Sequence, residues 1–182
     1  TGKMFASEYW KEAGVMPDIW ATAKSIGAGL PISAIVAREE IMESVLPGTI
    51  GGTYCGNPLS CAAAIKTIEI MERDNLAKRS LEIGEKVQAV YKKWMDKYEV
   101  IGDVRGLGGM IGIEFVTDKQ SKTPNGEIVS KIVKNAVEKG LMLENSGTYG
   151  QVIRFLAPLV MTDEQLKAGL EIFEEAIKKA LN

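Results

Sequence analysis

The stretch PDIWATAKSIGAGLP, residues 17–31, joins a mostly apolar run to a glycine-rich turn and carries a single lysine at the junction. Its pattern predicts a strand over residues 18–23 that ends just before Lys24, and a second strand over residues 32–37 after the turn. No other charge lies between Asp18 and Arg38. Partial desolvation there would lower the pKa of the lysine and make its amine a nucleophile toward an aldehyde. The alternative is a lysine that merely extends from a strand end into solvent.

The next part of the chain predicts a short helix, a loop and two longer helices. Asn57-Pro58 is a good helix start, because asparagine caps a helix and proline suits its first turn. Asp74 is expected to cap the following helix, whose apolar positions fall on one face. These predictions cover a helix at 38–45, a loop at 47–56, a helix from 57 to 72, and the stripe Leu76, Ile83, Val87, Val90 and Trp94.

From residue 99 onward the sequence predicts a small α/β unit. Its last helix begins with a capping box at residues 162–165 and continues with an apolar stripe. Both apolar stripes are expected to face a core rather than a ligand. The predicted strands are 100–104, 110–115 and 152–155, and the predicted helices are 127–139 and 163–181. The fold class is therefore α/β.

Composition excludes several classes of function. The 182 residues contain 22 basic and 24 acidic side chains, so no basic excess is present to bind nucleic acid. The longest uncharged stretch, residues 44–65, contains prolines and glycines and does not predict a membrane span. With no histidine and only Cys55 and Cys61, neither a histidine-based triad nor a zinc site is expected, and we expect no metal. We interpret the cysteines as free thiols in a reducing cytoplasm.

The chain opens with Thr1-Gly2-Lys3, which we interpret as a cut end without a signal peptide.

The glycine-rich sequence GLGGMIG at 106–112 has Ile111 where a dinucleotide fingerprint needs its third glycine. A tight bend between two strands is expected there instead, which disfavours a nicotinamide-dependent oxidoreductase.

Two segments could bind anions. Arg154 lies in an otherwise apolar strand, where an unpaired guanidinium is unfavourable, so it needs a carboxylate from a salt bridge or from a ligand. The loop Gly51-Gly52-Thr53 offers backbone N–H groups and a hydroxyl, which suit an anion, although a flexible loop without a ligand is the alternative.

Several motifs together resemble the class III aminotransferases of fold type I. The stretch 17–31 is similar to the cofactor-lysine segment of that family, and GGTYCGNPL at 51–59 is similar to the segment that follows it. TGKMFA at 1–6 resembles the usual lead-in, and VRGLG at 104–108 and IRFLAPL at 153–159 resemble the small C-terminal domain. The resemblance implies the end of the large domain at 1–57, connecting helices at 58–98 and the small α/β domain at 99–182.

The resemblance also implies roles for single residues. Lys24 would form an imine with pyridoxal 5'-phosphate (PLP) and then carry a proton between the substrate carbon and the cofactor. Thr53, helped by Gly51 and Gly52, would bind the cofactor phosphate of the neighbouring subunit, which implies a homodimer with shared sites. Arg154 would bind a substrate carboxylate. Arg105 also resembles a family position, but we expect it to support a turn.

The implied reaction is a ping-pong transamination between a small amino acid and a 2-oxo acid in the cytoplasm. The loop at 51–59 and the segment 157–165 look most like 4-aminobutyrate aminotransferases, which use 2-oxoglutarate. Acetylornithine and ornithine aminotransferases and glutamate-semialdehyde aminomutase share most of these residues, and a non-catalytic dimerisation or ligand-binding domain is a further alternative. A phosphate-binding loop, a ring-stacking aromatic residue and a pyridinium-pairing aspartate precede this region in the family. We therefore expect a C-terminal part with weak or no activity by itself.

Overall fold

The structure is a computed structural model that describes residues 1–11 and 13–182. The chain forms two compact units, of which one comprises residues 3–77 and the other residues 1–2 and 78–182. We call them the N-terminal unit and the C-terminal unit, and each is described by itself.

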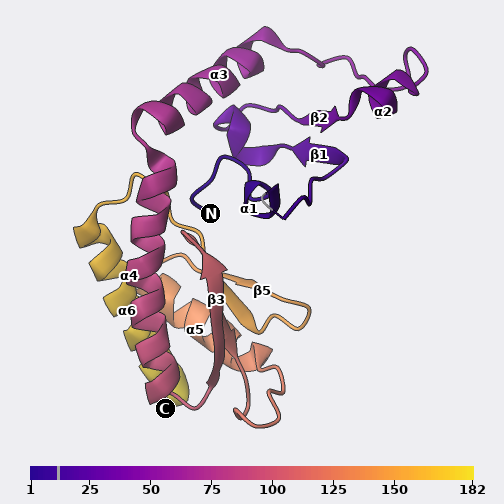
Figure 1. Ribbon diagram of the computed structural model, residues 1–182. Coiled ribbons are helices and arrows are strands. Elements are labelled where there is room, and N and C mark those ends of the chain that lie inside the picture. The colour runs from indigo at the N-terminus through magenta and orange to yellow at the C-terminus, as the bar shows by residue number, and fades with distance from the viewer. Residues whose placement is uncertain (12) are drawn as a thin grey trace. The chain divides into compact units, whose positions relative to one another are not determined.

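The N-terminal unit is built around a small antiparallel hairpin (Figure 1). Ile19 pairs with Ala37 and Thr22 with Ala34, and the connection between the two strands carries a short 3-10 helix. The predicted strands, the short helix and the irregular loop at 47–56 are confirmed, whereas the first helix was not predicted. The elements are α1 (Glu8–Lys11), β1 (Ile19–Thr22), η1 (Lys24–Gly27), β2 (Ala34–Ala37), α2 (Glu39–Glu43) and α3 (Pro58–Arg73).

Helix α3 begins as predicted but ends differently. The Asn57 side-chain oxygen accepts hydrogen bonds from the backbone N–H groups of Leu59 and Ser60, at 3.1 and 3.2 Å. Asp74, expected to cap the next helix, is instead the residue that ends α3. Its carboxylate pairs with the neighbouring Arg73 at 2.7 Å, so it is engaged before the next helix begins. The expectation for Asp74 is therefore wrong.

The C-terminal unit is a four-stranded antiparallel sheet with the strand order β3-β4-β6-β5 and three helices. The capping box of the last helix is present as predicted, with Thr162 accepting from the Gln165 N–H and Gln165 accepting from the Thr162 N–H. The short edge strand β5 was not predicted. The elements are α4 (Leu76–Lys97, whose first two residues belong to the N-terminal unit), β3 (Ile101–Leu107), β4 (Met110–Phe115), α5 (Gly126–Glu138), β5 (Glu144–Ser146), β6 (Val152–Phe155) and α6 (Asp163–Leu181).

The hydrophobic core of the C-terminal unit lies between one face of the sheet and the three helices. Alternation along β4 buries Ile111, Ile113 and Phe115 and turns the residues between them to the opposite, more exposed face. Tyr91 and Trp94 of α4 pack against Phe173 of α6, with ring centroids 5.7 and 5.4 Å from it. Most of the predicted apolar stripes of α4 and α6 therefore face the core, whereas Leu76 lies outside it and Leu181, at the end of α6, is 43% exposed.

The glycine-rich segment after β3 forms the tight bend that the sequence predicts. Leu107 pairs with Met110, so the turn consists of Gly108 and Gly109, and Gly108 has a φ of +53°. This turn packs on α4, where the Gly109 N–H donates to Ser80 Oγ at 2.9 Å. Gly84 of α4 faces the turn so closely that an added Cβ would lie 2.1 Å from the Gly108 carbonyl oxygen.

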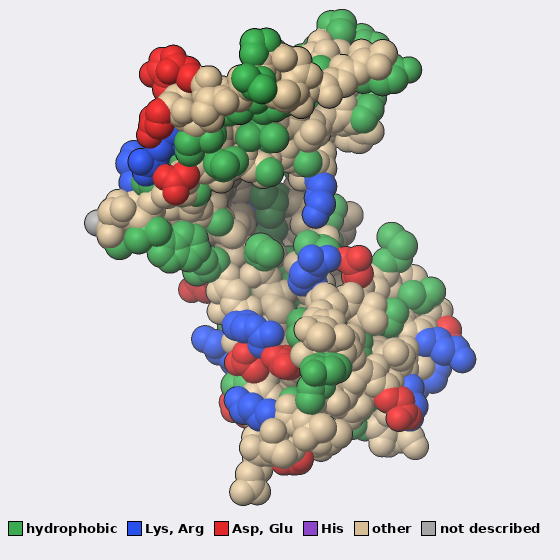
Figure 2. Space-filling view, turned by 90° about the vertical axis from the view of Figure 1, so that its right-hand side faces the viewer, with side chains coloured by type: hydrophobic (Ala, Val, Ile, Leu, Met, Phe, Trp, Pro, Cys, Tyr) green, Lys and Arg blue, Asp and Glu red, His purple; other side chains and the backbone are tan. Residues whose placement is uncertain are grey.

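The N-terminal unit has little core of its own. Among its described residues the buried ones are small, namely Gly27, Ser60 and Ala64, whereas large apolar side chains such as Trp10, Ile35 and Val36 are about half exposed. Hydrophobic side chains are accordingly visible on its surface in Figure 2. None of the helices in the described part of the chain is long and apolar enough to cross a membrane.

Candidate active site

Lys24 is the first residue of η1 and has a left-handed backbone conformation. Its φ is +58°, and Ala28 and Gly29 in the same connection have φ values of +48° and +97°. A non-glycine residue in this region is unfavourable by about 1–3 kcal/mol and persists only where the surrounding structure imposes it. The connection between β1 and β2 therefore fixes the Lys24 backbone at a strained angle, which is a frequent property of functional positions.

Close packing of small residues holds this connection in place. Helix η1 packs against α3, and the residues buried in the two elements are Gly27 in η1 and Ser60 and Ala64 in α3. A Cβ added at Gly27 would lie 2.7 Å from Ile32 Cγ2. Because η1 packs against α3, the position of Lys24 depends on this helix, which Asn57 caps directly after the glycine-rich loop.

The Lys24 ammonium group has no counter-ion in the described residues. The nearest charges in the sequence, Asp18 and Arg38, pair with each other at 3.0 Å. Within the part of the chain that the structure describes, no hydrogen bond or ion pair involves the Lys24 side chain. Lys24 is exposed, so of the two alternatives that the sequence left open this chain shows a lysine that extends into solvent. The reason is that the surrounding residues bury almost nothing larger than alanine or serine.

The loop that contains Gly52 and Thr53 forms one wall of a separate pocket. This pocket has a volume of about 540 Å³ and is also lined by Pro31, Ser33 and Asn57. None of the described residues that line it is acidic, and the Thr53 hydroxyl makes no hydrogen bond within the described chain. The loop is held by a turn in which the Cys55 N–H donates to the Gly52 carbonyl at 3.0 Å. Its free hydroxyl and exposed backbone can bind an anion.

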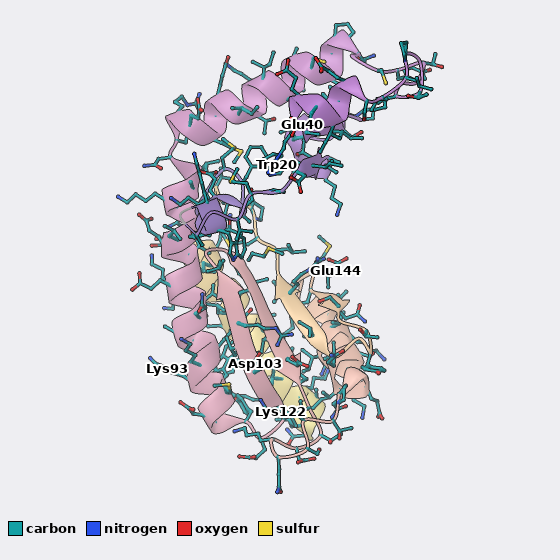
Figure 3. The ribbon with its side chains drawn as sticks, turned by 45° about the vertical axis from the view of Figure 1, so that its right-hand side comes forward. Trp20, Glu40, Lys93, Asp103, Lys122 and Glu144 are labelled. Carbon is teal, nitrogen blue, oxygen red and sulfur yellow. The ribbon has the colours of Figure 1, made fainter. Side chains whose placement is uncertain are left out.

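Arg154 lies on β6 in the C-terminal unit and is paired with a carboxylate, as its apolar strand requires. Its Nη2 donates to Glu144 Oε2 on β5 at 2.6 Å. Arg154 Nε is buried without a hydrogen-bond partner in the described residues. The side chain also borders an apolar pocket of about 390 Å³, which Phe155 and Phe173 help to line. Glu144 projects from β5 in Figure 3.

Arg105 stabilises the sheet from within β3 and is not part of the turn. Its Nη1 donates to Asp103 Oδ2 at 2.6 Å and also to Glu114 on β4. The Asp103 carboxylate, followed by that of Glu114, raises the pKa of Arg105 above its usual value. The predicted turn role is therefore wrong, because Arg105 lies within β3 and makes a cross-strand ion pair with Glu114.

Glu144 is the ion-pair partner of Arg154, and the sequence did not reveal it. It stands in the polar segment Glu144-Asn145-Ser146, which has no alternation of apolar residues and therefore gives no strand signal. A hairpin around Gly147 and Gly150, which both have positive φ, would have placed Glu144 opposite Arg154. The two glycines indicate a turn, but they do not give the strand register that brings Glu144 opposite Arg154.

The structure thus places Lys24, Gly52 and Thr53 in the N-terminal unit and Arg154 in the C-terminal unit. Lys24 does not line the pocket of Gly52 and Thr53. The predicted assignment of Lys24 and Thr53 to cofactors of two different subunits stays a prediction.

Comparisons with known proteins agree with the motifs. Residues 1–177 match the family described as aminotransferase class-III. The 5-aminovalerate aminotransferase DavT of Pseudomonas aeruginosa is 46% identical over 175 residues, which are 96% of this chain and 40% of that protein. The 4-aminobutyrate aminotransferase GabT of Escherichia coli is 40% identical over 180 residues, 99% of this chain and 42% of that protein.

A solved structure extends the likeness to the fold. The amine transaminase from an uncultivated Pseudomonas species, solved in its PLP-bound form, has a TM-score of 0.86 and 28% identity, covering 98% of this chain and 41% of that one. The chain spans about two-fifths of the length of the relatives that it matches. It belongs to the class III aminotransferase family, whose members depend on PLP.

Proposed function

We propose that the full-length protein carrying this chain is a PLP-dependent aminotransferase that transfers the amino group of an ω-amino acid, such as 4-aminobutyrate, to 2-oxoglutarate. The names of the two relatives support an ω-amino acid as donor, since 4-aminobutyrate and 5-aminovalerate differ by one methylene group. The observation that carries the proposal is the strained, unpaired Lys24 at the end of β1.

The residues present fit PLP on chemical grounds. PLP offers an aldehyde, a phosphate and an aromatic ring. The Lys24 amine, which has no counter-ion in the described chain, is a suitable partner for the aldehyde. The pocket lined by Gly52 and Thr53 has hydrogen-bond donors and, among its described residues, no carboxylate, as a phosphate requires. When bound, PLP supplies an electrophilic carbon and a ring that accepts electrons.

The side chains of this chain would perform binding, orientation and proton transfer. Lys24 Nζ holds or releases the proton that moves at the substrate carbon bearing the amino group. Thr53 Oγ1 and the Gly52 N–H donate to the phosphate. Arg154 binds a substrate carboxylate, because its guanidinium has donors that Glu144 leaves unused.

Assembly and location are also proposals. We infer a homodimer in which Thr53 of one subunit serves the cofactor of the other. The exposed apolar side chains of the N-terminal unit support a covered surface in the full-length protein. We place residues 1–57 in the large domain, 58–98 in connecting helices and 99–182 in the small domain. The free thiols of Cys55 and Cys61 support a cytoplasmic location.

The test is PLP titration, borohydride reduction and peptide mapping, applied to the chain and to the full-length enzyme. In the full-length enzyme we expect a single reduced adduct on Lys24, and no adduct at that position in Lys24→Ala. Lys66→Ala is the matched control, because Lys66 is an exposed lysine on α3 that pairs with Glu69. Its labelling pattern should equal that of the unchanged protein.

Activity assays with the full-length enzyme complete the test. Lys24→Ala should abolish transamination of 4-aminobutyrate, and Thr53→Ala should weaken PLP binding while leaving the maximal rate at saturating PLP nearly unchanged. Scattered labelling of many surface lysines in the full-length enzyme, together with an active Lys24→Ala variant, would refute the proposal.

A further inference from the structure

Ser60 is a buried serine whose hydroxyl group has no partner within the described chain. It lies in the first turn of α3, it is only 3% exposed, and it lines the pocket to which Gly52 and Thr53 contribute. Its backbone N–H donates to Asn57, but its Oγ makes no hydrogen bond to any described residue. A hydroxyl on so buried a side chain is unfavourable without a partner, so it needs one that the described chain does not supply.

Packing explains the small size of this side chain but not its hydroxyl group. Helix η1 packs against α3, and the buried residues of α3 are Ser60 and Ala64. Ala64 shows that a small side chain without a polar atom is sufficient for burial in this helix. Alanine at position 60 would fill nearly the same space, so the oxygen atom of Ser60 calls for a different explanation.

The Ser60 hydroxyl is the donor that the start of α3 leaves free. Pro58 has no N–H group, and the Asn57 side chain accepts from the N–H groups of Leu59 and Ser60 at 3.1 and 3.2 Å. The Cys61 N–H donates to the Asn57 carbonyl at 3.0 Å. These backbone donors are therefore occupied. The helix dipole still favours negative charge near this end of α3, and the hydroxyl can supply the hydrogen bond.

The pocket around Ser60 has the composition of a phosphate site. The hydroxyl groups of Ser33, Thr53 and Ser60 line it, and none of them makes a hydrogen bond within the described chain. Its described lining residues include no carboxylate that would repel an anion. A phosphate monoester has three strong acceptor oxygens, so it can accept hydrogen bonds from more than one hydroxyl at the same time.

We propose that Ser60 is a further cofactor-binding residue, whose Oγ donates to the phosphate group that Gly52 and Thr53 bind. The inference rests on the proposed function of that pocket. It adds a donor from the first turn of a helix to those of the glycine-rich loop. The same helix packs against η1, which begins at Lys24, so one element supports both the lysine and the phosphate site.

Replacing Ser60 by alanine should weaken phosphate binding without weakening the fold. The hydrogen bond from a hydroxyl to a phosphate dianion is charge-assisted, so its loss should raise the Kd of PLP about ten- to a hundredfold. Pyridoxal has the same aldehyde and ring but no phosphate, so its Kd should not change. Without any ligand the Tm should stay the same or rise, because alanine removes a buried polar group that lacks a partner.

The experiment uses the full-length enzyme freed of its cofactor, with Ser60→Ala, Thr53→Ala and the control Thr67→Val. Thr67 also lies on α3, and its hydroxyl donates to the Ala63 carbonyl at 2.8 Å, so the control removes a hydroxyl of the same helix that does not line the pocket. Absorbance titrations give the Kd of PLP and of pyridoxal. Thermal unfolding with and without inorganic phosphate measures phosphate binding independently of Lys24.

The outcomes separate this inference from the proposed function. Support requires that Ser60→Ala raise the Kd of PLP but not that of pyridoxal, reduce the stabilisation by inorganic phosphate, and leave the Tm without ligand undiminished, while Thr67→Val binds both compounds normally. If Thr53→Ala weakens PLP binding and Ser60→Ala does not, the role of Ser60 is refuted and the proposed function stands.

Two further results would overturn the inference. A lower Tm of Ser60→Ala without ligand, or an equal loss of pyridoxal binding, would show that the hydroxyl serves the fold. If neither Ser60→Ala nor Thr53→Ala weakens PLP binding, the pocket does not bind the phosphate group, and both assignments are wrong. Failure of the unchanged enzyme to form an adduct on Lys24 would instead refute the proposed function itself.

Discussion

Gly84 provides a sensitive test of how the C-terminal unit is packed. Replacing a glycine inside a helix by alanine usually stabilises the helix, and for α4 this gain should be about 1 kcal/mol. Here the added Cβ would lie 2.1 Å from the carbonyl oxygen and 2.3 Å from the carbonyl carbon of Gly108, and backbone atoms cannot rotate away. Relief of such overpacking requires about 1–3 kcal/mol. Displacing the turn would also break the hydrogen bond from Gly109 to Ser80, worth about 1 kcal/mol.

The net expectation is that Gly84→Ala destabilises the unit by about 2 kcal/mol, which lowers its Tm by roughly 10 °C. Gly169→Ala is the matched control, because Gly169 also lies inside a helix but its added Cβ would sit 3.7 Å from Leu141 Cδ1, an ordinary contact. That variant should raise the Tm by about 5 °C. Thermal unfolding followed by circular dichroism measures both changes. If Gly84→Ala raised the Tm as Gly169→Ala does, the close approach of α4 to the turn would be wrong.

Three further predictions concern helix ends. The hydrogen bond from Lys86, followed by that from Arg79, lowers the pKa of Asp163, so its stabilising contribution is present above the usual aspartate pKa and is lost as the pH falls through the lowered value. Asp163→Asn should therefore flatten the dependence of unfolding free energy on pH in acid, and an unchanged slope would contradict this. Thr162→Ala removes the capping box of α6 and should destabilise the C-terminal unit by about 1 kcal/mol in urea unfolding, whereas no change would show that the cap is dispensable. Asn57→Ala should speed hydrogen exchange at the first amides of α3 relative to the middle of that helix, and equal protection would count against the cap.

Most of the fold could be read from local signals. The strand at 110–115 buries every second residue, and the strand at 152–155 is a short apolar run interrupted only by Arg154. Helix α6 is marked by a capping box at its start and by an apolar stripe along its buried face. These signals involve neighbours in sequence, so tertiary context does not overrule them. Asp74 shows where such local signals fail. An aspartate before a helix predicts a cap, but here the adjacent Arg73 binds the carboxylate, a competition that pattern reading does not weigh.

The sequence was enough to name the candidate site residues, but not to predict their neighbours or their backbone conformation. Lys24 and Arg154 stand out because a charged side chain is unusual in their segments, whereas Thr53 was singled out by the resemblance of its loop to the family. The partner of Arg154 did not stand out, since Glu144 becomes its neighbour only through a hairpin register that the polar segment 144–151 does not reveal. The strain at Lys24 was equally hidden, because no sequence pattern reports a left-handed lysine.

Lys24 is exposed because the residues buried in the described N-terminal unit are all small. Desolvating an ammonium group needs bulky apolar side chains around it, and the described N-terminal unit buries only Gly27, Ser60 and Ala64 while Ile35 and Val36 remain half exposed. The hairpin and α3 therefore set the backbone of Lys24, but they cannot set its environment. On the proposed function, the surfaces that desolvate Lys24 must come from polypeptide outside the described residues or from a second subunit. Selective labelling of Lys24 in the full-length enzyme but scattered labelling in this chain would show that the desolvating surfaces come from outside the described residues.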